Sequence, residues 1–295
     1  MKNNSFNKKL LTILTVSILT FSTIVNVQAK TISQKVTNID RIAEMQAKVN
    51  STHPGGEVIN TEKYIEFTKS NDINGDIKIQ RKEFNKAGYL EQIKSEAISN
   101  AAILTTNSIL TNNSTTPGPV TSWLKTSLDV TSYGPTATFI DVTGYFQWLK
   151  APFYAMTDVI AITHDSNSGI PNGSQHLSVV FPRETVGGDI ASPLYMDKSY
   201  TSSDYINNTT AGGAFKFSLE NSKASLNYGP YGYMTVMAAK AQTTTSATTV
   251  CFTYGHSQNG VNIVPAIRFP GGAVITITPV DKIDAVSMST FAYYK

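Results

Sequence analysis

Six residues in one short stretch carry oxygen atoms at the spacing of a metal-binding loop. The stretch runs from Asp72 to Glu83, and its positions 1, 3, 5, 7, 9 and 12 are Asp72, Asn74, Asp76, Lys78, Gln80 and Glu83. A hard cation such as calcium takes six to eight oxygens, including a backbone carbonyl at position 7 and a bidentate carboxylate at position 12. The carbonyl of Lys78 and the carboxylate of Glu83 match those two roles. The spacing therefore predicts a calcium site.

The stretch resembles the loop of EF-hands, and its start, Asp72-Ile73-Asn74-Gly75-Asp76, is similar to the variant found in dockerin modules. The resemblance covers twelve residues and implies calcium as cofactor and a helix on each side. Thr61 suits the N-cap of the preceding helix, and Phe84 opens helical spacing after the loop. Position 6 is Ile77 instead of glycine, and no second loop follows. The alternative is an ordinary turn rich in Asp and Asn.

The first 29 residues have the layout of a secretory signal peptide. Lys2, Lys8 and Lys9 form a basic start, an apolar run follows, and Val27-Gln28-Ala29 is a small-residue cleavage site. The apolar run is short for a membrane span. We therefore expect a secreted, extracellular protein without stable membrane insertion, in the style of a Gram-positive bacterium.

Charge and cysteine usage narrow the function classes further. Residues 1–29 carry three lysines and no acidic residue, so the chain from Lys30 holds 21 basic and 21 acidic residues. A neutral chain gives no reason to expect nucleic acid as a partner. Cys251 is the single cysteine, so an internal disulfide is excluded and stability must come from a buried core.

Composition divides the chain into a charged N-terminal part and a longer, weakly charged remainder. Residues 30–104 read as a small helical unit, in which Ile42 and Val49 mark an amphipathic segment. Residues 105–119 are rich in Ser, Thr, Asn and Pro and read as a linker. Residues 120–295 read as a β-sandwich. The predicted fold is thus α+β and two-part: a helical unit with the EF-hand-like loop, then an all-β sandwich of jelly-roll type.

The β prediction rests on an alternation of period two. Phe215, Phe217 and Leu219 alternate with polar residues, and the same pattern runs from Ile140 to Trp148. Further candidate strands of this kind lie around 177–181, 250–254, 261–269 and 275–277, and turn signals separate them. Eight or nine strands in about 175 residues favour a sandwich.

The β region offers little for catalysis, and no catalytic residue is assigned. It holds no nucleophile elbow, zinc-protease motif or glycine-rich phosphate loop. A polysaccharide hydrolase needs only a pair of carboxylates, so this class stays as the alternative. The candidate carboxylates, expected to face solvent at strand ends, are Asp158, Glu184, Asp189 and Glu220. Four further residues read as scattered polar positions near strand ends: His164, Asp165, His176 and His256.

Aromatic residues favour binding, because flat rings stack on sugar faces and Tyr adds a hydroxyl group. One cluster comprises Tyr145, Trp148, Phe153 and Tyr154. Another surrounds a Gly-Pro-Tyr-Gly turn, where Tyr228 and Tyr231 are expected to be exposed on a loop and to contact the ligand.

The sequence thus predicts a secreted, non-catalytic binding or surface-interaction protein with a calcium-binding loop. Its partner would be a glycan or another cell-surface component, and its oligomeric state is left open. A β-pore toxin is disfavoured, because the Thr-rich run 242–249 is too short to span a bilayer. A structural matrix component would also suit the low charge.

Overall fold

The computed structural model describes residues 40–52, 54–71, 77–107, 120–134, 136–154, 156–183, 194–209, 212–219, 229–257, 264–268, 274–278 and 283–294. The chain divides into two compact units: Arg41–Asn85 with Pro119–Lys295, and Met1–Asp40 with Lys86–Gly118. Helix α3 (Lys86–Asn107) belongs to the second unit. No helix in the described ranges is long and apolar enough to cross a membrane.

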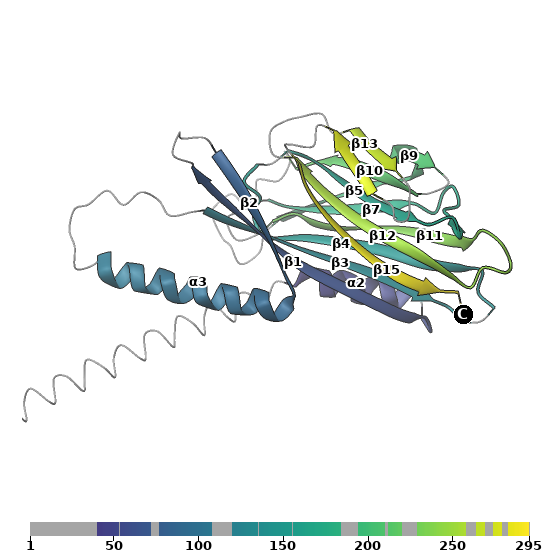
Figure 1. Ribbon diagram of the computed structural model, residues 1–295, viewed down its shortest axis with the longest axis horizontal. Coiled ribbons are helices and arrows are strands. Elements are labelled where there is room, and N and C mark those ends of the chain that lie inside the picture. Colours follow the sequence, from purple (N-terminus) through teal and green to yellow (C-terminus); the bar gives the residue numbers. More distant parts are fainter. Residues whose placement is uncertain are drawn as a thin grey trace, which may run out of the picture. The chain divides into compact units, whose positions relative to one another are not determined.

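The first unit is a sandwich of two antiparallel sheets (Figure 1). Within the described residues, sheet A has eight strands in the order β2-β1-β3-β4-β11-β7-β8, with β6 beside β11. They are β1 (Glu57–Asn71), β2 (Ile77–Phe84), β3 (Val120–Ser132), β4 (Phe139–Lys150), β6 (Ser168–Gly169), β7 (His176–Arg183), β8 (Leu194–Tyr200) and β11 (Tyr231–Lys240).

Sheet B has five described strands in the order β15-β12-β5-β10-β9. They are β5 (Thr157–His164), β9 (Ile206–Thr209), β10 (Gly212–Ser218), β12 (Ala247–Ser257) and β15 (Ile283–Tyr293). The short helix η1 (Ser202–Asp204) precedes β9, and β13 (Val264–Arg268) pairs with β14 (Val274–Thr278) as a separate hairpin.

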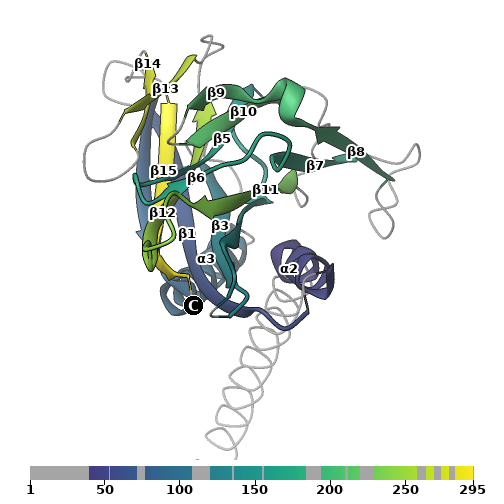
Figure 2. The ribbon, with the colours of Figure 1, turned by 90° about the vertical axis from the view of Figure 1, so that its right-hand side faces the viewer.

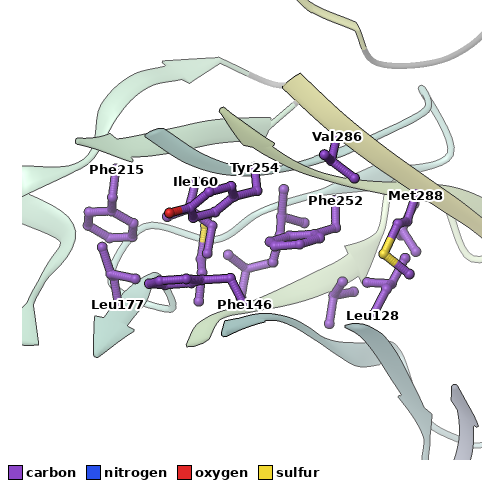
Figure 3. Close-up of a cluster of buried hydrophobic side chains, with 14 of the residues drawn as sticks. Leu128, Phe146, Ile160, Leu177, Phe215, Phe252, Tyr254, Val286 and Met288 are labelled. Atoms are coloured by element: carbon purple, nitrogen blue, oxygen red, sulfur yellow. The ribbon is translucent and has the colours of Figure 1, made fainter. Parts of the chain in front are cut away.

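Alternating apolar residues build the core between the sheets (Figure 3). Phe146 from sheet A lies with its ring centroid 4.7 Å from that of Tyr254 in sheet B. Phe252 packs over Gly144, where a Cβ atom would overlap the phenylalanine ring. The absence of a side chain at Gly144 therefore lets the two sheets approach closely.

The segments on both sides of the predicted calcium loop are strands instead of helices. β1 pairs with β2 from Tyr64 opposite Phe84 to Asn71 opposite Ile77, and its other edge pairs with β3. Tyr64, Ile65, Glu66 and Phe67 are all buried, so this part of β1 is covered on both faces. The prediction of a helical unit over residues 30–104 is therefore wrong between residues 57 and 84, which belong to sheet A.

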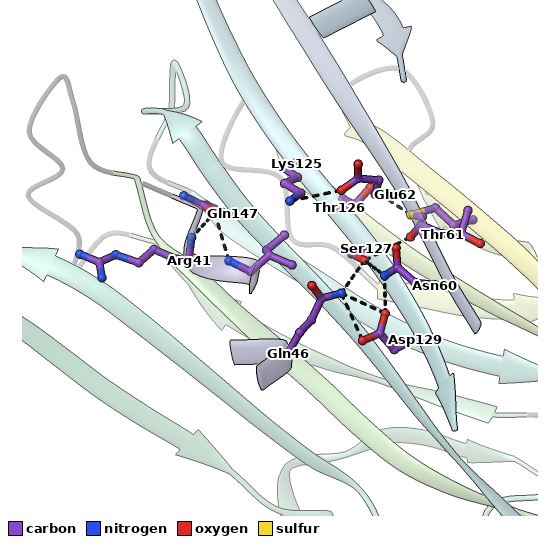
Figure 4. Close-up of polar contacts among 12 residues, drawn as sticks. Arg41, Gln46, Asn60, Thr61, Glu62, Lys125, Thr126, Ser127, Asp129 and Gln147 are labelled. Carbon is purple, nitrogen blue, oxygen red and sulfur yellow. Dashed lines mark hydrogen bonds and ion pairs between the residues drawn. The ribbon is translucent and has the colours of Figure 1, made fainter. Parts of the chain in front are cut away.

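The amphipathic segment predicted near Ile42 forms helix α2 (Arg41–Thr52), which packs on the outer face of sheet A (Figure 2). Its buried residues Ile42 and Met45 cluster with Tyr145 of β4. The amides of Arg41 and Ile42 donate to Oε1 of Gln147 at 3.0 and 3.3 Å (Figure 4). The first turn of a helix leaves amides without intrahelical partners, so this side chain of the sheet caps α2.

A second polar contact holds the middle of α2. Gln46 Nε2 donates to the carboxylate of Asp129 at 3.0 and 3.2 Å, and Asn60 of β1 donates to the same carboxylate (Figure 4). Burial raises the pKa of Asp129, although the hydrogen bonds from Asn60 and Gln46 oppose the rise. The helix is thus fixed by apolar packing and by a buried carboxylate.

The free edge of β15 is closed by side chains from sheet A. Lys63 Nζ donates to the carbonyl of Ser287 at 3.1 Å, and Ser132 Oγ donates to the carbonyl of Tyr293 at 2.9 Å. Arg81 donates to the carbonyl of Ala285. These three contacts join the edges of the two sheets.

The β-sandwich prediction is confirmed, and the described chain is mostly β with helices α2 and α3. The jelly-roll topology stays a prediction. The predicted signal peptide and most of the predicted linker lie outside the described residues.

Candidate ligand-binding site

A small pocket lies at one end of the sandwich, where strands of sheet A meet the end of β12. Sheet A and the loop after β4 contribute Phe67, Ile79, Ser122, Trp148, Phe153 and Tyr154. β12 contributes His256. The pocket is small: about 10 Å³ of it can hold the centre of a water molecule, and the empty space of about 200 Å³ includes open solvent. Rings therefore dominate the lining of the pocket.

The rings are held in place by contacts with one another. Phe67 and Trp148 have centroids 5.5 Å apart, and Trp148 meets the imidazole of His256 edge-on at 4.9 Å. The ammonium group of Lys69 lies 5.0 Å from the ring centroid of Tyr154, within cation–π range. Tyr154 is partly exposed, whereas Trp148 is buried. The pocket thus has a rigid floor and a more accessible rim.

A buried hydrogen-bond network fixes the floor. Trp148 Nε1 donates to the hydroxyl of Tyr254 at 2.9 Å, and that hydroxyl donates to Asp158 Oδ2. His256 Nδ1 lies 2.7 Å from Asp158 Oδ1. Asp158 is 0% exposed and His256 is 3% exposed. The phenol of Tyr254 and the imidazole of His256 thus share the two carboxyl oxygens of Asp158.

Tyr254 stays an uncharged donor in this network. Full burial raises the pKa of Tyr254 well above its usual range, and the neighbouring Asp158 raises it further. Tyr254 therefore keeps its hydroxyl hydrogen at neutral pH. The ring of His256 is oriented with Nδ1 toward Asp158. Nε2 is the ring nitrogen left for a ligand.

The pocket residues are poorly arranged for hydrolysis. The hydroxyl of Ser122 donates to the backbone carbonyls of Lys150 and Ala151 at 2.9 and 2.7 Å, so it is not held by His256 as a nucleophile. None of the lining residues is a carboxylate. Among the described residues, no group of three or more His, Cys, Asp or Glu side chains could hold a metal ion. Phe67, Ser122, Trp148 and His256 are almost fully buried, so the partly exposed rings of the pocket are those of Phe153 and Tyr154.

The predicted calcium ligands are not gathered by the described part of the loop. Asp72, Asn74 and Asp76 lie outside the described residues, whereas Lys78, Gln80 and Glu83 lie on β2. An extended strand rises about 3.3 Å per residue, so Lys78 and Glu83 are separated by roughly 16 Å along β2. Such a separation does not suit two ligands of one ion. Calcium binding near Asp72 stays a prediction without the helix–loop–helix context.

Glu83, the expected bidentate ligand, is occupied by two cations. Its carboxylate accepts from Lys63 Nζ at 3.0 Å and from Arg81. Partial burial raises the pKa of Glu83, but the hydrogen bonds from Lys63 and Arg81 outweigh this effect and the pKa is lowered. Glu83 therefore serves here as an ion-pair partner across the hairpin.

The predicted aromatic ligand contacts lie elsewhere. Tyr228 is outside the described residues. Tyr231 is the first residue of β11, where it is half-buried against the cluster of α2 and lies 6.0 Å from the guanidinium carbon of Arg41. The expectation of an exposed loop position is wrong for Tyr231, because the residue continues the strand that pairs with β4. A ligand contact by either residue stays a prediction.

Among the four carboxylates that were candidates for a catalytic pair, Asp158 is the one that lies in the described residues, and it is not exposed. Asp158 is fully buried and hydrogen-bonded instead of facing solvent. The other candidates, Glu184, Asp189 and Glu220, lie outside the described residues. The aromatic cluster did include three pocket residues, Trp148, Phe153 and Tyr154, but the pairing of Asp158 with His256 was missed.

The sequence contains a signal for the pairing of Asp158 with His256. Asp158 has the same strand parity as Ile160, and His256 has the same parity as Tyr254, so both polar residues occupy inward positions. Inward polar groups need a partner. The two residues stand directly opposite each other on β5 and β12.

No family model matches the chain, and no curated protein matches it. Among solved structures, it is similar to the collagen-binding domain of a Staphylococcus aureus adhesin, with TM-score 0.30 and 6% identity over 53% of this chain and 88% of that domain. It is also similar to ACE19, the collagen-binding subdomain of the Enterococcus faecalis surface protein ACE (TM-score 0.29, 8% identity, 53% and 87% covered). The collagen adhesin CNA from S. aureus gives TM-score 0.29 and 8% identity over 81% and 94%. At these values the similarities do not establish a common fold or function.

Proposed function

We propose that the chain is a secreted, non-catalytic binding protein that holds an extracellular ligand at the rim of the aromatic pocket at the end of the sandwich. The observation that carries the proposal is the lining of this pocket: rings from Phe67, Trp148, Phe153 and Tyr154 converge with the imidazole of His256. Aromatic walls with a few fixed polar groups are typical of binding sites. Secretion is supported by the signal-peptide layout of residues 1–29.

Binding is favoured over hydrolysis because the polar groups at the pocket already form hydrogen bonds with other groups of the protein. Ser122 donates to two carbonyls, and Asp158 is buried behind His256. A general acid or base must reach the reacting atom within hydrogen-bond distance. Asp158 has no such access.

Tryptophan fluorescence offers a direct test, because Trp148 forms part of the pocket and Trp123 is the only other tryptophan. The Trp123→Phe variant leaves Trp148 as the reporter. We expect its emission to change when the protein is titrated with one member of a panel of soluble glycans, cell-wall fragments and collagen. The same titrations, assayed for new reducing ends, should show none.

Two variants connect binding to the pocket. Tyr154→Ala removes a partly exposed ring of the pocket rim, whereas Phe291→Ala removes a ring that is 51% exposed on β15. Phe291 stands opposite Thr249, seven residues along β12 from His256, which corresponds to roughly 23 Å. We expect binding to weaken only with Tyr154→Ala. Equal binding by both variants, or release of reducing ends, would reject the proposed function.

A further inference from the structure

The outer edge of β2, on the side away from β1, is a second surface of the molecule that suits a partner. We propose that this edge binds an extended peptide segment of alternating acidic and apolar residues, which adds to sheet A as a further strand. Three properties of β2 support this proposal: the backbone groups at its edge, the exposure of its side chains and their charge.

β2 lies at one end of sheet A. It pairs with β1 over all eight residues from Ile77 to Phe84, and no described strand pairs with its opposite edge. In an antiparallel ladder, every second residue points its backbone N–H and C=O groups away from the neighbouring strand. About half of the residues of β2 therefore direct these groups to the outer edge. The edge of β15 differs, because Lys63, Arg81 and Ser132 occupy its carbonyls.

The side chains of β2 leave its outer edge accessible. Six of its eight residues are exposed, all except Ile79 and Phe84. Ile77 is 56% exposed. Ile79 and Val120 flank Lys69 on the neighbouring strands, and Val120 is 53% exposed. Large exposed apolar side chains on and beside an edge strand favour pairing with another chain, because an added strand would cover them.

The two faces of β2 differ in chemistry. Lys78, Gln80 and Lys82 share one face, whereas Ile77 and Ile79 share the other. Residues directly opposite each other on paired strands have Cβ atoms about 4.5–5.5 Å apart, so their side chains interact. A partner strand with carboxylates on the first face and apolar side chains on the second therefore complements β2. Such a segment alternates acidic and apolar residues along its sequence.

The charge of β2 favours an acidic partner over a second copy of this chain. The strand carries three cations, Lys78, Arg81 and Lys82, against the single acid Glu83. Glu83 already accepts from Lys63 and Arg81. Two β2 strands side by side would therefore bring like charges together, which is destabilising across paired strands. An acidic segment instead places carboxylates opposite the amines of Lys78 and Lys82.

The opposite end of sheet A offers a matched control. β8 carries one acid and one base, Asp197 and Lys198, so this strand has no net charge. β8 lies six positions from β2 in the strand order, which corresponds to roughly 29 Å at the usual spacing of strands. Lys198 is exposed, so reversal of its charge changes the net charge of the protein without touching β2.

The test measures binding of a dye-labelled, end-capped octapeptide of alternating Glu and Val to the full-length protein by fluorescence anisotropy. A peptide of alternating Lys and Val is the charge control, and a peptide with four Glu before four Val is the pattern control. We expect the alternating acidic peptide to bind roughly tenfold more tightly than either control.

Two variants connect the binding to β2. Lys78→Glu should weaken it roughly five- to tenfold, because an attraction across the paired strands is replaced by a repulsion. Lys198→Glu alters the net charge by the same amount and should leave the affinity within about twofold.

Hydrogen exchange distinguishes strand addition from loose electrostatic attraction. The amides of β2 that point to its outer edge should exchange quickly in the protein alone. With saturating peptide, these amides should exchange at least roughly tenfold more slowly, because the added strand accepts hydrogen bonds from them.

Several results would overturn the inference. They are no binding of the alternating acidic peptide up to about 1 mM, equal binding of either control peptide, and binding without slower exchange in β2. Equal weakening by Lys78→Glu and Lys198→Glu would show a response to net charge alone and would also overturn it. Slow exchange of the same amides in a dimeric protein without peptide would assign the edge to a second copy. The proposed function would still stand in each case, because these measurements do not involve the pocket rim.

Discussion

Replacing Tyr254 by Phe would remove one oxygen atom from the centre of the buried network. That oxygen accepts from Trp148 Nε1 and donates to Asp158 Oδ2, and Tyr254 and Asp158 are both 0% exposed. The variant keeps the ring that packs on Phe146 at 4.7 Å, so the apolar core is retained. The variant leaves two buried groups, the Nε1–H of Trp148 and Oδ2 of Asp158, without the hydroxyl that was their hydrogen-bond partner.

The expected loss follows from the two hydrogen bonds. A neutral hydrogen bond contributes about 1 kcal/mol and one to a charged group about 1.5–3 kcal/mol, so the free energy of unfolding should fall by about 2–4 kcal/mol. Urea unfolding in the Trp123→Phe background, followed by the fluorescence of Trp148, measures this loss, because that side chain belongs to the network itself. The slope of the transition should be unchanged, since the same surface is exposed on unfolding.

Tyr293→Phe is the matched control. Tyr293 lies on β15 and is 52% exposed, so removal of its hydroxyl should change stability by no more than about 0.5 kcal/mol. A loss below about 0.5 kcal/mol for Tyr254→Phe would refute the reasoning, because two buried groups, the Nε1–H of Trp148 and the carboxyl group of Asp158, cannot lose a hydrogen-bond partner at so small an energetic cost.

Three further predictions concern the polar contacts of sheet A. Because burial raises the pKa of Asp129, the folded state retains this proton at a pH where the unfolded chain has lost it. Stability should therefore decline as pH rises from about 4, and Asp129→Asn should flatten this decline in melting curves, whereas an identical pH dependence would contradict the proposed burial effect. Gln147→Ala removes the acceptor that caps α2, so amide hydrogen exchange should become faster at Arg41 and Ile42 and stability should fall by about 1 kcal/mol; unchanged exchange would mean that the cap is dispensable. Glu83→Gln breaks two ion pairs of a side chain that is 35% exposed, so it should lower stability by no more than about 1 kcal/mol, equally with calcium and with chelator. A calcium-specific rise in Tm that Glu83→Gln abolishes would instead support the predicted calcium site with all six of its ligands.

The sandwich was predictable where one face of a strand differs from the other. Phe215 and Phe217 of β10, and Leu219 directly after it, are all buried in the core. Their alternation with polar residues is visible in the sequence. The run Tyr64-Ile65-Glu66-Phe67 lacks this contrast because β1 is covered on both faces there. Periodicity alone cannot separate such a strand from a helix.

The pocket was predictable only in part. Trp148, Phe153 and Tyr154 are close in sequence, so their grouping was visible. His256 reaches the same pocket through strand pairing over a separation of 98 residues from Asp158. Pairing of this kind depends on the order of strands in sheet B, and the alternation within one strand carries no information about that order.

The closed edge of β15 has a consequence for the behaviour of the protein at high concentration. An open edge strand offers unpaired carbonyl and amide groups to a second chain, which is a common route to fibrils and precipitates. In this molecule, Lys63, Arg81 and Ser132 occupy carbonyls along that edge, and two of the three are cations that also repel an approaching copy. This row of side chains therefore opposes edge-to-edge pairing of two copies of the protein at high concentration.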